Sequence, residues 1–159
     1  MDEMPTSEMN SDQFTDNAVA LLARANRAAS RLRHEYIGTE HIVLALTEAN
    51  VDVVTAALEG IGVDPRKVNE AITGIVTSGR ADQPSGLKRP FTSRTRTSFT
   101  FAAESARQMG QPRIGPEHLL LGILREQMNI GAQVLGQHGL TLETATRAIE
   151  QIRSAGGSL

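Results

Sequence analysis

Two stretches of the chain, residues 37–46 (IGTEHIVLAL) and residues 114–123 (IGPEHLLLGI), carry the same motif, Ile-Gly-x-Glu-His, 77 residues apart; we call it the repeated phrase. Each copy places a Glu–His pair directly before an apolar run. Such a pair could ligate a metal, act as an acid/base couple, or mark the start of a duplicated structural unit. The residues around the two copies decide between these interpretations.

The similarity extends far beyond the repeated phrase. Residues 14–75 align with residues 91–152 without a gap, and 14 of the 62 aligned positions are identical. The identical pairs are Phe14/Phe91, Thr15/Thr92, Ala25/Ala102, Ala29/Ala106, Ile37/Ile114, Gly38/Gly115, Glu40/Glu117, His41/His118, Leu44/Leu121, Leu58/Leu135, Gly62/Gly139, Ala71/Ala148, Ile72/Ile149 and Ile75/Ile152. A long ungapped register of this kind indicates a tandem duplication.

The first half of each unit predicts two helices. In the first unit, apolar residues recur at helical spacing over residues 18–32. Gly38 and Thr39 then open a short second helix. Its run at residues 42–46 is apolar on all sides, which predicts a buried central helix.

The second half of each unit predicts two more helices, so we expect an all-α fold. Residues 53–61 carry the apolar spacing of a third helix. Asp64 and Pro65 predict the N-cap and first turn of a fourth. The second unit repeats this plan, with Thr141 at the capping position of Asp64.

Residues 95–101 (TRTSFTF) are rich in residues that favour strands, and taken alone they would predict one. Their register with the first helix of the first unit predicts a helix instead, because tertiary packing commonly overrides local propensity.

These patterns divide the chain into an acidic, disordered leader (1–13), a first repeat (14–77), a linker (78–90), a second repeat (91–153) and a flexible tail (154–159). The linker is punctuated by Gly, Pro and Ser and is basic, so we expect a solvated loop. An alternative is that the acidic leader lies against this basic linker.

Composition excludes several classes of protein. A net charge of −2 gives no nucleic-acid-binding character to the whole molecule. The chain has no Cys, which excludes disulfides and thiol chemistry and fits a cytoplasmic location. No apolar run approaches the roughly 18 residues needed to span a membrane. The polar, acidic N-terminus does not resemble a secretory signal peptide.

Catalytic and metal-binding patterns are weak. The spacing of His34–Glu35 and Glu40–His41 does not match H-E-x-x-H, and the second unit has Gln111 where the first has His34. No G-x-S-x-G elbow and no Walker phosphate loop occurs in the sequence. We therefore expect no metal, no cofactor and no enzymatic activity.

The repeated phrase is best explained as the start of a buried helix. A Glu in the first turn is favourable there because the exposed N–H groups carry partial positive charge. The functional alternative is a mixed site, in which free amides bind an anion and the carboxylate binds a cation. A phosphorylated guanidinium carries both charges.

These residues resemble a known family. The segments YIGTEHIVLAL and RIGPEHLLLGILRE, together with LEGIGV, VLGQHGL and the two Phe-Thr starts, are similar to the duplicated N-terminal domain of Clp-type AAA+ unfoldases, above all the ClpC kind. The resemblance covers residues 14 to about 153. It implies a compact, pseudo-twofold all-α domain that acts as a receptor for substrates and adaptor proteins of a Clp protease.

The resemblance also implies ligand-binding residues. By position, Glu40 and Glu117 would bind phosphoarginine on tagged substrates, with Thr15 and Thr92 as neighbours. In actinobacterial relatives, cyclic peptide antibiotics bind a surface at the second Phe-Thr start, which corresponds to Phe91 and, in the first unit, to Phe14.

Departures from the family pattern lead to two functional alternatives. Pro116 replaces the Thr of the second motif and removes a hydroxyl, so we expect the two sites to be unequal. The acidic leader favours a free-standing protein over an excised domain. Such a protein would bind tagged proteins or cyclic peptides itself, or it would regulate the Clp ATPase by binding it or competing with its N-domain.

Overall fold

A computed structural model describes residues 10–48, 52–79 and 88–156. Its elements are η1 (Ser11–Gln13), α1 (Asp16–Arg31), α2 (Thr39–Glu48), α3 (Asp52–Ile61), α4 (Pro65–Ile75), α5 (Ser93–Gln108), α6 (Pro116–Glu126), α7 (Ile130–Gln137) and α8 (Leu142–Gly156). The all-α prediction is confirmed, with four α-helices from each unit. The described residues add only two isolated β-bridges.

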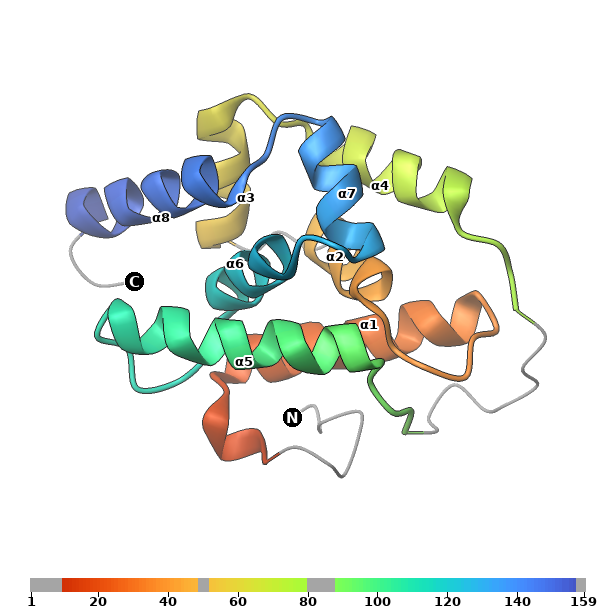
Figure 1. Ribbon diagram of the computed structural model, residues 1–159. Helices are drawn as coiled ribbons and strands as arrows, with labels where there is room; N and C mark the ends of the chain where they lie inside the picture. Colours follow the sequence, from red (N-terminus) through yellow and green to blue (C-terminus); the bar gives the residue numbers. More distant parts are fainter. Residues whose placement is uncertain (1–9, 49–51, 80–87, 157–159) are drawn as a thin grey trace.

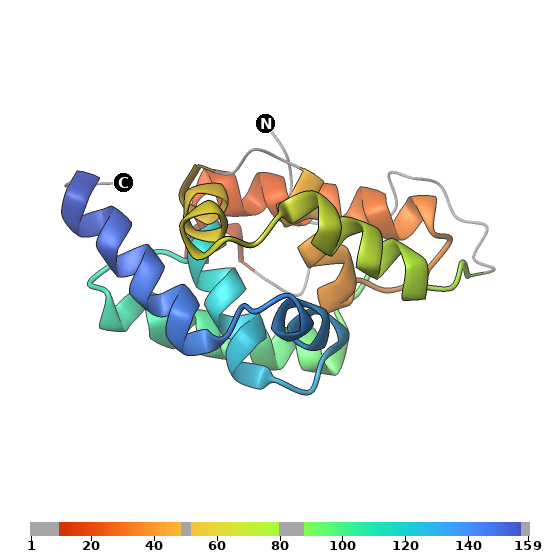
Figure 2. The ribbon, with the colours of Figure 1, turned by 90° about the horizontal axis from the view of Figure 1, so that it is seen from above.

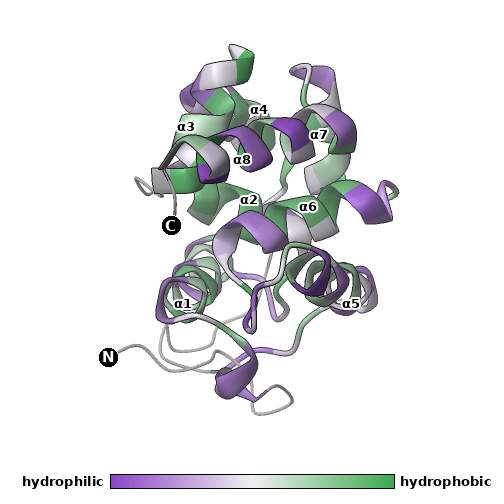
Figure 3. Ribbon diagram, turned by 90° about the vertical axis from the view of Figure 1, so that its left-hand side faces the viewer, coloured by the Kyte–Doolittle hydropathy of each residue, from purple (hydrophilic) through white to green (hydrophobic). Residues whose placement is uncertain are grey.

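The helices form three layers (Figures 1 and 3). Helices α1 and α5 lie along one side, α2 and α6 occupy the centre, and α3, α4, α7 and α8 cover the other side. As predicted from their apolar runs, the central helices are buried: all residues from Thr39 to Leu46 and from Pro116 to Leu124 lie in the interior. The two central helices therefore supply the middle of one shared core.

The two units pack against each other through the helices of their second halves. Helix α3 of the first unit packs on α8 and α6 of the second, and α7 of the second unit packs on α2 and α4 of the first. Seen from above, the α3–α4 pair and the α7–α8 pair lie on opposite sides of a pseudo-twofold axis (Figure 2). Neither unit can bury its apolar faces alone, so the duplication forms a single compact domain.

Two backbone bridges lock the units together. Phe14 pairs with Ile114, and Ile37 pairs with Phe91. The amide of Thr15 donates to the carbonyl of Ile114 at 2.9 Å, and the amide of Thr92 donates to the carbonyl of Ile37 at 3.0 Å. The start of each unit is thus joined to the segment that precedes the central helix of the other.

The predicted capping residues occupy their positions. The Asp64 carboxylate accepts from the amide of Arg66 at 2.9 Å, and the Thr141 hydroxyl accepts from the amide of Thr144 at 3.1 Å. These bonds satisfy amides that have no partner within the helix. The helix starts recognised from sequence therefore have the expected local cause.

The strand-like segment at residues 95–101 is helical, as its repeat register predicts. Within α5, the hydroxyls of Thr97 and Ser98 donate to carbonyls one turn earlier, at 3.1 and 3.0 Å. Phe99 makes edge-to-face contacts with Phe91 and Phe14, with centroids 4.7 and 5.9 Å apart. The hydroxyls are thereby satisfied within the helix, and the packing of Phe99 in the core overrides the strand propensity.

The structure differs from the expected boundaries in three places. Residues 11–13, expected in a disordered leader, form the 3-10 turn η1, and α8 continues to Gly156. In the linker, expected to be solvated, Arg89 is buried and 2% exposed. Residues 1–9 and 80–87 lie outside the described part, and with them the proposed contact between leader and linker.

Helix length bears on the membrane question. Among the described residues, no single helix is long and apolar enough to cross a bilayer. Helices α2 and α3 reach the length and apolar composition of a membrane span only when they are taken together, and the two are bent by 88° relative to each other.

Helices α5 and α6 approach closely at Gly122. A Cβ added to Gly122 would overlap the carbonyl oxygen of Ser98 and would lie 2.9 Å from the amide nitrogen of Ala102. The first unit has Ala45 at this position, fully buried. Because both atoms near Gly122 belong to the α5 backbone, no side-chain rotation can relieve the overlap.

We therefore predict that Gly122→Ala lowers the free energy of unfolding by about 1–3 kcal/mol, the usual cost of overpacking a core. The matched control is Gly136→Ala in α7, where an added Cβ meets nothing within 4 Å. That change should be neutral or stabilising by about 0.5–1 kcal/mol, because Ala favours a helix over Gly. Chemical denaturation measures the free energy of unfolding of both variants. Equal values for Gly122→Ala and Gly136→Ala would contradict the close approach of α5 and α6 at Gly122.

Candidate binding sites at the two helix starts

The glutamates of the repeated phrase are folded back into the protein. Glu40 and Glu117 are each 7% exposed in the first turns of α2 and α6. A Cβ added to Gly38 would overlap the Glu40 carboxylate, and one added to Gly115 would overlap that of Glu117. Each glycine thus leaves the space that its glutamate fills. Burial raises the pKa of Glu40, although a hydrogen bond from its own amide and the nearby His34 oppose the shift.

The histidines of the phrase cap the same helices. The amide of Gly38 donates to Nδ1 of His41 at 2.9 Å, and the amide of Gly115 donates to Nδ1 of His118 at 2.9 Å. Each imidazole therefore satisfies an amide at the helix start, in the manner of the side chain that closes a capping box. The other ring nitrogen is also engaged in each copy: Nε2 of His41 bonds to His34, and Nε2 of His118 lies 3.3 Å from a terminal nitrogen of Arg153. The geometry therefore gives no support to an acid/base role for the Glu–His pair.

In the first unit, His41 belongs to a chain of hydrogen bonds. Because its Nδ1 accepts from Gly38, its Nε2 carries the proton and donates to Nδ1 of His34 at 2.8 Å. Nε2 of His34 in turn donates to the carbonyl of Thr77 at 2.8 Å. Burial, with help from the charges of His34 and Arg89, lowers the pKa of His41 to about 3. His41 is therefore a neutral structural residue.

The linker supplies a buried cation beside this chain. Nε of Arg89 donates to the carbonyl of His34 at 2.9 Å, and one terminal nitrogen donates to the side-chain oxygen of Asn26 at 3.1 Å. Burial lowers the pKa of the Arg89 guanidinium. Arg89 thus ties the end of the linker to the segment after α1.

In the second unit, an arginine lies beside the glutamate and the histidine of the repeated phrase. A terminal nitrogen of Arg153, in the last turn of α8, lies 3.1 Å from the carboxylate of Glu117 and 3.3 Å from Nε2 of His118. Burial lowers the pKa of His118, with Glu117 opposing and Arg153 adding to the shift. The two glutamates therefore have different partners: Glu117 has a guanidinium, whereas Glu40 forms no ion pair with any described residue.

Thr39, the residue that Pro116 replaces, does not face the glutamate. Its hydroxyl accepts from the amide of Gly131 at 3.2 Å, and the residue is 2% exposed. The Thr39/Pro116 difference thus concerns the contact between α2 and the start of α7. The expectation that this hydroxyl distinguishes the two sites directly is not supported.

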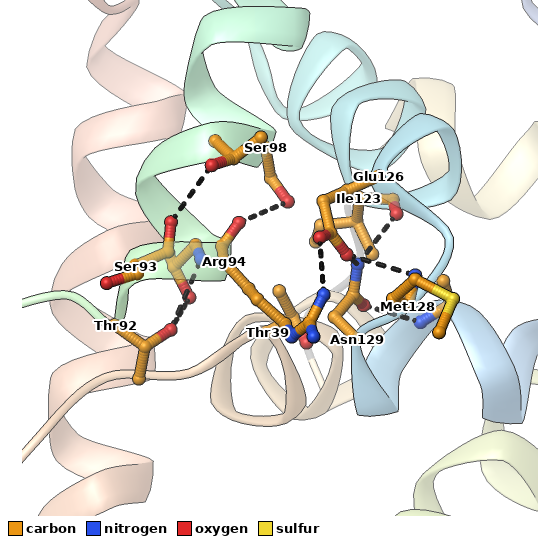
Figure 4. A network of polar contacts seen from close by, with 12 residues as sticks. Thr39, Thr92, Ser93, Arg94, Ser98, Ile123, Glu126, Met128 and Asn129 are labelled. Atoms are coloured by element: carbon orange, nitrogen blue, oxygen red, sulfur yellow. Dashed lines mark hydrogen bonds and ion pairs between the residues drawn. The ribbon is translucent and has the colours of Figure 1, made fainter.

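The connection between α6 and α7 is held by a polar network next to Thr39 (Figure 4). The side-chain amide of Asn129 donates to the carbonyl of Ile123 and to the carboxylate of Glu126, both at 3.0 Å. The same carboxylate receives Arg94 of α5 at 2.9 Å. This network fixes the start of α7 and with it the amide that bonds to Thr39.

The other expected site residues differ in burial: the two threonines are half-buried, whereas the two phenylalanines lie in the core. Thr15 and Thr92 are half-buried N-caps of α1 and α5, and their hydroxyls accept from amides three residues later at 3.1 and 3.2 Å. Through the backbone bridges, Thr15 lies beside the segment leading to Glu117, and Thr92 beside that leading to Glu40. Phe14 and Phe91 are 1% and 2% exposed, so their rings lie in the core.

Of the expected mixed site, the carboxylates are in place, but the amides expected to bind an anion already have hydrogen-bond partners. The amides of Gly38 and Gly115 are taken by the histidines, and the amide of Glu40 bonds to its own carboxylate. Within the described residues, no group of three or more side chains of the metal-ligating kind lies together. The geometry therefore favours a cation partner for the carboxylates.

Arg153 was missed by sequence reasoning for a simple reason. The compared repeats end at Ile152, and the residue aligned with Arg153 is Val76. A charge that appears in only one copy of a duplication was the available signal. Its contact with Glu117, 36 positions away, needs the folded chain.

We predict that the His41 ring stays uncharged down to about pH 4, measured by its NMR titration. The unfolded chain takes up a proton near pH 6.5 that the folded protein binds only near pH 3. Stability from His41 is therefore present above about pH 6.5 and is lost as pH falls towards 3, by up to about 1.4 kcal/mol per pH unit. His41→Asn keeps an acceptor for Gly38 but cannot titrate, so its stability should approach that of the wild type on acidification. A His41 midpoint near 6.5 would refute the buried chain.

Comparison with known proteins is consistent with this architecture. The model of the Clp repeat (R) N-terminal domain family matches residues 13–138 and again residues 90–156. The chain is 32% identical over 140 residues to the negative regulator of genetic competence ClpC/MecB of Bacillus subtilis, and equally to the chaperone protein ClpB of Oceanobacillus iheyensis. These alignments cover 88% of this chain and 17% of each relative, so the chain spans about a sixth of their length.

Solved structures of N-terminal domains of Clp proteins have the same fold. The N-terminal domain of ClpD from Arabidopsis thaliana superposes with a TM-score of 0.69 at 25% identity, over 89% of this chain and 98% of that one. The N-domain of ClpV from Vibrio cholerae shares the fold with a TM-score of 0.74 at 16% identity, over 90% and 86% of the two chains. The chain therefore belongs to the Clp repeat N-terminal domain family.

Proposed function

We propose that this protein is a non-catalytic binding module that captures proteins carrying phosphoarginine for a Clp protease. The observation that carries the proposal is the burial of Glu40, which forms no ion pair with a described arginine or lysine and is stabilised only by its own amide and the nearby His34. A buried carboxylate is costly unless a cation or hydrogen-bond donors compensate it. The guanidinium of a ligand would supply that compensation.

The helix dipole alone does not explain this burial. Glu143 has a comparable place in the first turn of α8, yet its side chain is 79% exposed and pairs with Arg147 at the surface. A first-turn glutamate can therefore favour a helix start while remaining in water. The glycine two residues before Glu40 and Glu117 instead makes room for a carboxylate inside the protein.

We assign recognition of the guanidinium to the carboxylates. A guanidinium and a carboxylate form short, charge-assisted hydrogen bonds of defined geometry. Among the described cationic side chains, Arg153 already shows this contact with Glu117. Thr15 and Thr92 are neighbours of the two sites through the backbone bridges, so their substitution should affect the ligand indirectly.

Cyclic peptide antibiotics are a second ligand class implied by the resemblance. This proposal has less support, because the rings of Phe14 and Phe91 are buried against Phe99. Such a peptide would bind atoms around Phe91 or displace its ring.

The same surface supports the alternative of a regulator. A chain that binds tagged proteins on its own would compete with the N-domain of a cytoplasmic Clp ATPase for them. Added to that ATPase with its protease, it should slow degradation of a phosphoarginine-tagged substrate without changing ATP hydrolysis. A changed rate of ATP hydrolysis in the absence of substrate would instead indicate direct binding to the ATPase.

We predict that the double variant Glu40→Gln/Glu117→Gln binds phosphoarginine at least ten-fold more weakly than the wild type, measured by isothermal titration calorimetry. A hydrogen bond to a charged group contributes about 1.5–3 kcal/mol, and 1.4 kcal/mol corresponds to ten-fold. Glu143→Gln is the matched control, since it removes a first-turn carboxylate from the surface. Equal affinities of the three proteins would exclude the glutamates as the binding site.

Replacing Glu40 should weaken ligand binding without lowering the stability of the fold. Because the fold raises its pKa, ionised Glu40 costs stability above its unfolded pKa, and the cost is present at pH 7. Glu40→Gln should therefore melt at or above the wild-type temperature while losing affinity. A clear drop in melting temperature would indicate that Glu40 is structural.

A further inference from the structure

The two helix starts differ in one charged contact. Arg153 reaches Glu117 at 3.1 Å, and the two side chains are only 16% and 10% exposed. At the other helix start, Glu40 is buried to the same degree, but no described arginine or lysine forms an ion pair with it. The second unit thus already contains a guanidinium at its carboxylate.

The difference arises from the length of the last helix of each unit. Helix α8 has 15 residues and α4 has 11, so α8 is four residues longer, and Arg153 lies in the added turn. The aligned residue, Val76, caps α4 by donating to the carbonyl of Ile72 at 3.0 Å and packs against the core. The first unit has no cationic side chain at this position of the repeat.

Arg153 fits its place incompletely. Its Nε is buried and has no hydrogen-bond partner. Its terminal nitrogen faces Nε2 of His118, which carries a proton because Nδ1 accepts from Gly115. Two donors therefore meet there, and the guanidinium gains only one hydrogen bond, to Glu117. An arginine side chain free to orient both nitrogens could form a bidentate pair with the carboxylate.

We propose that Arg153 is an internal substitute for the ligand's guanidinium, so that the domain has one open site at Glu40 and one closed site at Glu117. The closed site binds a phosphoarginine ligand only when Arg153 is removed or displaced. This inference rests on the proposed function. It assigns the inequality of the two sites to Arg153 and Val76, and no longer to Thr39 and Pro116.

Calorimetric titration with free phosphoarginine tests the stoichiometry. The wild type should bind one equivalent, and Glu40→Gln should bind none that is detectable. Arg153→Ala should bind two equivalents, and Glu40→Gln/Arg153→Ala should bind one. Arg147→Ala, which removes a surface arginine from the same helix, should still bind one equivalent. Circular dichroism melts verify that each variant is folded.

Amide NMR spectra locate the ligand without relying on stoichiometry. Phosphoarginine should shift the amide signals of residues 38–41 in the wild type, and additionally those of Gly115, Glu117 and His118 in Arg153→Ala. Two equivalents bound by the wild type would overturn the inference while leaving the proposed function intact. One equivalent bound by Arg153→Ala, with the amide signals of Gly115, Glu117 and His118 unshifted, would also overturn the inference and leave the proposed function intact. Absence of binding in every protein would instead refute the proposed function itself.

Discussion

The structure depends on two backbone bridges that cross between the units. Ile37 pairs with Phe91 and Ile114 with Phe14, so the segment before each central helix is bonded to the start of the other unit. Buried amides and carbonyls need partners, and separation of the units would leave these groups without them. Helices α2 and α6 therefore begin at positions that both units define. The same bridges bring Thr15 to the segment before Glu117 and Thr92 to that before Glu40.

The repeated phrase is a set of mutually dependent residues. The apolar run anchors the helix in the core, His41 or His118 satisfies the glycine amide, and the glycine leaves room for the glutamate. Gly115 has φ −99°, a conformation open to any residue, so its lack of a side chain matters for the space beside the Glu117 carboxylate and not for backbone freedom. Placing a carboxylate in that space is costly, and sites that violate local stability rules are commonly functional. This is the physical basis for regarding the two glutamates as binding residues.

Much of the fold could be predicted from sequence because its causes are local. Helical spacing, the caps at Asp64 and Thr141, and the apolar runs each involve residues within a few positions of one another. The repeat register also corrected the strand propensity of residues 95–101, since the first unit displays the helical pattern more clearly. The candidate glutamates were found in the same way, together with their position in the first helical turn.

The sequence by itself determined an all-α duplication, its helix starts and the two first-turn glutamates. Only the tertiary structure decided that the second halves of the units pack across their boundary, that Thr39 bonds to Gly131 across 92 positions, and that Arg153 pairs with Glu117. It also placed the rings of Phe14 and Phe91 in the core. The physical reason is the range of the interactions: capping and periodicity act within one or two turns of a helix. Contacts between distant residues depend instead on how the two units pack, which no local pattern encodes.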